Sequence, residues 1–88
     1  MKTYYLTKDK VILIQSTDWD VIEKFAKERV EAMENDLDLD MSFTVYEKDE
    51  GSVYHVYHAW LSGGDGKCYF KSFSPRRDVT DSFNKSYV

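Results

Sequence analysis

Between residues 36 and 46, apolar and polar residues alternate strictly along the chain. The odd positions over 37–45 are all apolar and the even positions over 36–44 are all polar. Successive side chains of a β-strand point to opposite faces, so this two-residue period predicts a strand with one buried face. Asp36, Asp38 and Asp40 would then lie on the solvent side of that strand.

The preceding segment, residues 16–35, has the longer period of an α-helix. Ile22, Ala26, Val30 and Met33 follow one another at spacings of four, four and three, which predicts a single apolar stripe on an amphipathic helix. Thr17 can cap the helix, because its hydroxyl can accept a hydrogen bond from an N–H group of the first turn.

The patterns of the remaining segments predict mainly β-strands. Residues 4–15 predict either a tight hairpin around Asp9 and Lys10 or one bent strand, with the aliphatic run over 11–14 buried on both faces. Residues 53–61 and 68–73 predict two further strands, separated by turns, and these form an antiparallel meander with the strand after residue 36. Val79, Phe83 and Tyr87 recur every four residues, which favours a short C-terminal helix with Pro75 at its first position.

This order of elements predicts one α+β domain over residues 1–88. We expect a mostly antiparallel sheet of roughly four to five strands, in the element order β(β)αβββ(α), with one main helix packed on one face. A chain of 88 residues is short, so the expected core is small and the stability modest.

Net charge and cysteine content limit the possible partners and the cellular compartment. A net charge of −4 argues against nucleic acid as a direct partner and permits a basic protein partner. A single cysteine, Cys68, excludes an internal disulfide and fits a reducing compartment. No apolar run is long enough for a membrane span, and the first residues do not open a secretory signal. We therefore expect the cytoplasm, or the host cytoplasm if the gene is viral.

Three interpretations of the row of aspartates are open. Asp36, Asp38 and Asp40 have the spacing of the first calcium ligands of an EF-hand loop, but Met41 occupies the position that requires glycine. The simplest interpretation is that the three aspartates form the solvent-exposed face of a strand. The third is an acidic patch that steers a basic partner. Its candidate residues are Glu34, Asp36, Asp38, Asp40, Asp49 and Glu50.

The predicted strand over 53–61 has apolar or aromatic residues on both faces. In a sheet covered by a helix on one face only, the uncovered face should be polar. We assign Ala59 and the other odd positions to the helix side, because a small side chain lets a helix approach closely. The opposite face is then a candidate partner-binding surface made of Tyr46, Tyr54, His58, Trp60 and Tyr69. Alternatively, the C-terminal segment covers this face and forms a second small core with it.

The sequence gives little support for a catalytic site or a metal site. His55 and His58 are three residues apart, which in a regular strand places them on opposite faces and argues against a shared metal. No arrangement of Ser, His and Asp or of Cys and His can be assembled, and the glycine-containing turn over 62–67 lacks the phosphate-loop spacing. We predict no cofactor, no metal and no enzymatic activity.

In its bulk properties the chain resembles the inhibitor and immunity proteins of phages and bacteria, which are small, acidic and rich in tyrosine. The resemblance implies a non-catalytic domain that binds and inhibits a basic macromolecule, such as a nucleic-acid enzyme. Two alternatives remain: a regulatory or structural homodimer that associates through the sheet, and a small enzyme or ligand-binding domain with a site around His55 or His58.

Overall fold

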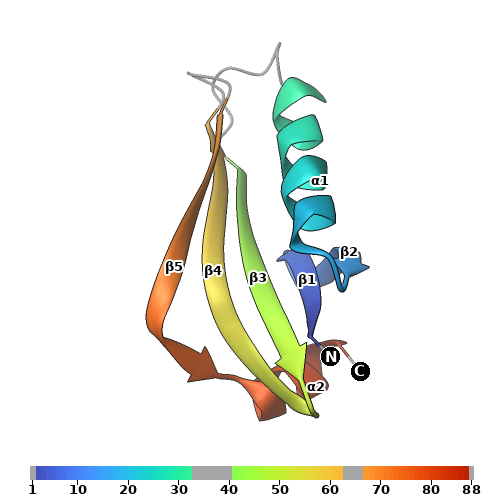
Figure 1. Ribbon diagram of the computed structural model, residues 1–88, viewed down its shortest axis with the longest axis vertical. Helices are drawn as coiled ribbons and strands as arrows, with labels where there is room; N and C mark the ends of the chain where they lie inside the picture. The colour runs from blue at the N-terminus through green and yellow to red at the C-terminus, as the bar shows by residue number, and fades with distance from the viewer. Residues whose placement is uncertain (1, 33–40, 63–66, 88) are drawn as a thin grey trace.

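The computed structural model describes residues 2–32, 41–62 and 67–87, and within them it shows an α+β fold with one antiparallel sheet and two helices (Figure 1). The sheet has the strand order β2-β1-β3-β4-β5. None of the helices in these ranges is long and apolar enough to cross a membrane. The elements are β1 (Thr3–Lys8), β2 (Val11–Ser16), α1 (Trp19–Ala32), β3 (Met41–Asp49), β4 (Ser52–Ser62), β5 (Lys67–Asp78) and α2 (Thr80–Tyr87).

The first two strands form a tight hairpin, one of the two arrangements that the sequence allows. Asp9 and Lys10 at its turn have φ values of 51° and 65°, the left-handed conformation that two-residue hairpin turns require. The expectation that residues 11–14 are buried on both faces is wrong. Because β2 is an edge strand, Val11 remains 56% exposed.

Helix α1 begins one residue later than a Thr17 cap would place it. The Asp20 N–H donates to the Asp18 carboxylate at 2.9 Å, so Asp18 caps the helix in place of Thr17. The N–H of Asp18 in turn donates to the hydroxyl of Ser16 at 3.0 Å. This entry turns Trp19 toward the sheet, where its ring contacts Tyr4, Tyr57 and Phe70 at centroid distances of 5.3, 4.9 and 5.3 Å.

The main core lies between α1 and the sheet. Ile22 and Ala26 of α1 are fully buried, which confirms this part of the predicted apolar stripe. Phe43 and Val45 of β3 are buried as the alternation predicts, whereas residues 36–40 of the predicted strand lie outside the described residues. The cluster consists of Leu6, Ile22, Ala26, Phe43, Val45, Val56 and Ala59.

The C-terminal helix exists, but it begins at Thr80, and Pro75 lies within β5. The start is fixed by hydrogen bonds that the pattern of apolar residues does not reveal. The Asp78 carboxylate accepts from the N–H of Thr80 at 3.0 Å and from its hydroxyl at 2.7 Å. That hydroxyl also accepts from the N–H of Val53 at 2.9 Å, which ties α2 to the start of β4.

Candidate functional site

A bulge in β4 decides which side chains share a face of the sheet. The partners of His55 and Tyr57 on β3 are consecutive residues, so Val56 is an extra residue in β4. One extra residue reverses the alternation beyond it. His55 and His58 therefore lie on the same face, and the expectation that they lie on opposite faces is wrong.

We call the side of the sheet opposite α1 the open face, and α2 packs on the part of it that carries Tyr5 and Tyr46. The ring of Phe83 lies 5.3 Å from that of Tyr5 and 5.2 Å from that of Tyr46, and Tyr87 lies 5.8 Å from Tyr46. Phe83 is 4% exposed and Val53 of β4 is fully buried. This half of the open face is a second small core, and Tyr46 belongs to it.

The other half of the open face carries three stacked rings. Trp60 stacks on Tyr69 of the neighbouring strand at 5.3 Å with an interplanar angle of 19°, and on His58 at 6.0 Å with an angle of 26°. Tyr69 is 36% exposed, and His58 and Trp60 are partly exposed. These three residues, named here the aromatic stack, are the part of the predicted binding surface that the structure brings together.

The charged residues that the described strands place on the open face are basic. In the register between β4 and β5, Lys71 lies opposite His58 and Arg77 lies opposite His55, and both basic side chains are exposed. Among the described residues of the five strands, no aspartate or glutamate occupies a position on this face. Of the acidic residues of β3 and β5, Glu47 and Asp49 belong to the α1 side, and the Asp78 carboxylate caps α2.

Tyr54 does not belong to the predicted surface. It lies opposite Glu47 of β3 and packs against the core under α1, because the extra residue Val56 separates its alternation from that of Trp60. Arg76 covers its ring, with the guanidinium carbon 4.6 Å from the ring centre. The predicted surface is therefore divided twice. Tyr54 lies on the α1 side of the sheet, and on the open face α2 covers Tyr46.

The structure describes only part of the predicted acidic patch. Glu34, Asp36, Asp38 and Asp40 lie outside the described residues. Asp49 and Glu50 lie at the end of β3 remote from Met41, and a nine-residue strand separates its two ends by about 26 Å. The described acids therefore do not lie beside the aromatic stack.

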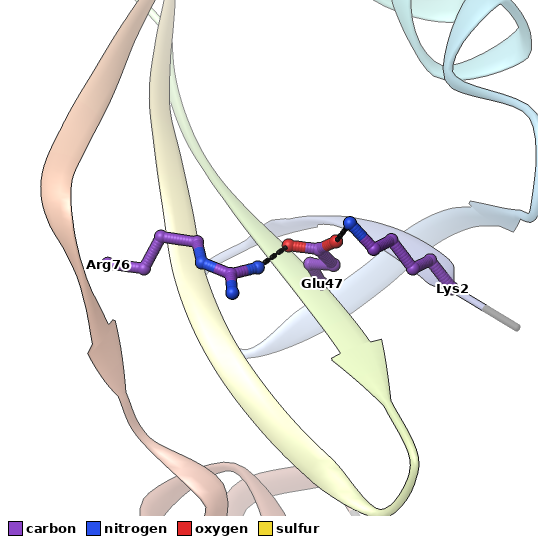
Figure 2. Close-up of polar contacts among 3 residues, drawn as sticks. All are labelled: Lys2, Glu47 and Arg76. Atoms are coloured by element: carbon purple, nitrogen blue, oxygen red, sulfur yellow. Dashed lines mark hydrogen bonds and ion pairs between the residues drawn. The ribbon is translucent and has the colours of Figure 1, made fainter.

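Sequence reasoning missed a buried carboxylate, Glu47, which is held between two basic residues (Figure 2). Its side chain is 5% exposed, and its two oxygens lie 3.1 Å from the Lys2 ammonium and 2.6 Å from a guanidinium nitrogen of Arg76. The signal was present in the alternation, since Glu47 occupies an odd, inward position. Counted from Asp36, Glu47 is at the twelfth position, where an EF-hand loop has its last ligand, but here its partners are the basic residues Lys2 and Arg76.

These three residues, named the Glu47 cluster, border a hollow of about 300 Å³. The hollow lies on the α1 side, where Ser72 and Arg77 of β5 pair with Tyr57 and His55 of β4 and the residues between them loop away from the ladder. Neither His55 nor His58 lines it. The remaining lining residues are Tyr4, Val56, Tyr57 and Ser72.

His55 lies on the open face beside the ring of Tyr46, at a centroid distance of 5.6 Å. Burial lowers its pKa below the usual 6.5, and the positive charges of Arg77 and His58 act in the same direction, while a hydrogen bond with the backbone of Tyr57 opposes them. Within residues 2–32, 41–62 and 67–87, no three His, Cys, Asp or Glu side chains converge as metal ligands.

Comparisons with models of known families, with curated protein sequences and with solved structures found no match to this chain. The geometry described above is therefore the basis of the functional argument.

Proposed function

We propose that this chain is a non-catalytic protein-binding domain of the inhibitor or immunity-like kind, which engages its partner through the aromatic stack. One observation carries the proposal: half of the open face is covered by α2, and the other half exposes three stacked rings. Aromatic side chains gathered on a rigid sheet supply large contact area with little entropy cost, as in the energetic centres of protein interfaces.

The stacking geometry favours a protein over nucleobases as the partner. At 5.3 Å and 19°, Trp60 and Tyr69 already use ring faces on each other. A platform for single-stranded nucleic acid instead offers its ring faces to the bases. The indole N–H and the phenol O–H of these residues are polar groups of the kind that interface aromatics present to a protein partner.

The acidic residues over 34–40 have a separate role in this proposal. They would attract a basic region of the partner over long range and raise the association rate, while the aromatic stack supplies the affinity. Replacing Asp36, Asp38 and Asp40 together by asparagine should slow association and weaken its dependence on salt. An unchanged association rate would remove these aspartates from the proposal.

Affinity capture from the native host, followed by mass spectrometry, tests the proposal when wild type and a Trp60→Ala variant are used side by side. A partner that depends on the aromatic stack should be retained by wild type and lost by Trp60→Ala at equal folded concentration. Lys24→Glu, on the exposed side of α1, is the control that should retain it. Equal retention by Trp60→Ala and wild type would reject the aromatic stack as the binding surface.

A further inference from the structure

The chain has 12 basic and 16 acidic residues, but five of the acidic residues and none of the basic ones lie outside the described ranges, so these ranges hold 12 bases and 11 acids. By sequence, Asp40 directly precedes β3 and Asp65 lies between β4 and β5, so the charges compared below are only those of the described strands. The five acidic residues are Glu34, Asp36, Asp38, Asp40 and Asp65.

The residues beside the aromatic stack are basic. Lys71 lies directly across from His58 and two residues along β5 from Tyr69, so its ammonium shares the open face with the three rings. Arg77 lies across from His55, where the open half meets the half covered by α2. Both side chains are exposed, and in the described strands no carboxylate shares their face.

Resting on the proposed function, we propose that the partner segment bound by the aromatic stack is an acidic stretch of protein. Carboxylates of this segment pair with Lys71 and Arg77, and its apolar or aromatic side chains lie against Trp60 and Tyr69. Charge complementarity with the described strands selects this occupant, because a segment with carboxylates gains ion pairs with Lys71 and Arg77, whereas a basic segment meets like charge there.

The presence of Lys71 on an edge strand has a second explanation, which does not involve a partner. Edge strands carry lysines that discourage pairing with strands of other molecules. That role does not require the lysine to lie beside stacked rings, and it does not account for Arg77 or for the position of the acidic residues on the other side of the sheet. The two explanations differ in what happens when the charge of Lys71 is reversed in the presence of an acidic peptide.

The probes are three ten-residue peptides in which tyrosine alternates with glutamate, glutamine or lysine, titrated into ¹⁵N-labelled protein and followed by NMR. The glutamate peptide should shift amides of β4 and β5 around Trp60 and Tyr69, and bind at least tenfold more tightly than the glutamine peptide. The lysine peptide should bind most weakly. Equal affinities for the glutamate and glutamine peptides would overturn the inference.

Two matched variants separate local from global charge. Lys71→Glu and Lys24→Glu change the net charge equally, but only Lys71 lies on the open face. Lys71→Glu should weaken the glutamate peptide at least tenfold, while Lys24→Glu should change its affinity less than twofold. Equal losses would show that only overall charge matters and would refute the inference.

The same titration distinguishes failure of this inference from failure of the proposed function. If all three peptides bind equally and Trp60→Ala weakens each of them, the aromatic stack binds protein without selecting acidic segments. If no peptide perturbs β4 or β5, both proposals fail. A ten-nucleotide oligo(dT) that binds this face more tightly than the glutamate peptide would replace the acidic protein segment by single-stranded nucleic acid.

Discussion

At the scale of single residues, the Glu47 cluster gives the sharpest expectation about stability. Glu47 is buried, but Lys2 and Arg76 are about half exposed. Removing Arg76 leaves a buried carboxylate with one cation, whereas removing Glu47 leaves two cations that can turn into solvent. We expect Arg76→Met to lower the free energy of unfolding by about 2–3 kcal/mol and Glu47→Gln by about 1–2 kcal/mol.

Urea denaturation of the two single variants and of the double variant checks this order. The double variant should lose less than the two single losses added together, because the second change removes no further ion pair. Lys2→Met should have the smallest effect of the three, since Lys2 lies near the chain end and its side chain is half exposed. A larger loss for Glu47→Gln than for Arg76→Met would contradict the argument from the stranded carboxylate.

His55 gives a pH-dependent expectation. Its pKa in the folded protein is below the usual 6.5, mainly because of burial. The unfolded chain therefore binds a proton at higher pH than the folded one, so stability is full above pH 6.5 and falls as the pH drops through 6.5 toward the lowered pKa. Thermal unfolding from neutral to mildly acidic pH should show this loss, and His55→Gln should reduce it. An unchanged pH profile in His55→Gln would assign the loss to other groups.

At the scale of secondary-structure elements, the two halves of the open face should respond differently to truncation. Phe83 of α2 is 4% exposed and fills the second small core, so Phe83→Ala should cost about 3–4 kcal/mol. Trp60→Ala should cost less than about 1.5 kcal/mol, because the aromatic stack is partly exposed and faces solvent. Chemical denaturation measures both, and a loss of several kcal/mol for Trp60→Ala would show that its ring belongs to a core.

The Thr80 hydroxyl contributes to the attachment of α2, in addition to the packing of Phe83 and a backbone hydrogen bond from the Val79 N–H to the Val53 carbonyl at 2.8 Å. The Thr80 hydroxyl accepts from the N–H of Val53 and donates to the Asp78 carboxylate. Thr80→Val keeps the shape but leaves that N–H without its acceptor, so it should cost about 1–2 kcal/mol. Thr80→Ser keeps the hydroxyl and should cost less than half as much in the same urea titration. Equal losses for the two variants would mean that the methyl group, and not the hydroxyl, secures α2.

These elements also show how far the sequence could be interpreted. The α+β class, the helix over the Ile22 and Ala26 stripe and the antiparallel meander follow from periodicity, because burial of one face imposes a period on the residues. The division of β4 between two faces does not follow, since a bulge adds one residue without altering local composition. Val56 stands between His55 and Tyr57 in a segment with apolar or aromatic residues on both faces, so nothing in the sequence marks it as the extra residue.

The candidate site was predictable to the same extent. His58, Trp60 and Tyr69 were correctly placed together, because they lie beyond the bulge, where the alternation is regular again. Tyr54 was assigned to the wrong face because it precedes the bulge. Tyr46 lies on the open face but under α2, and only the hydrogen bonds at Thr80 decide where that helix starts.

At the scale of the whole molecule, the chain has charges distributed unequally over the two faces of one sheet. Lys71 and Arg77 share the open face with no acidic residue of the described strands, whereas on the α1 side Glu47 is paired with Lys2 and Arg76. Such a separation favours association with a partner whose charge is locally complementary, and it penalises contact between two copies through the same open face, since like charges would then meet. The homodimer alternative consequently depends on the edges of the sheet.

The edges give the last expectation, which concerns oligomeric state. The longer edge strand, β5, contains Pro75, which has no N–H to donate, and the exposed Lys71, and both features discourage pairing with a second copy. We expect a monomer at concentrations up to about 100 μM, because these features should raise the dimer dissociation constant above that range. Light scattering measures this, and replacing both Lys71 and Pro75 by threonine should increase self-association. A concentration-dependent wild-type dimer that Trp60→Ala leaves intact would favour the homodimer through a sheet edge.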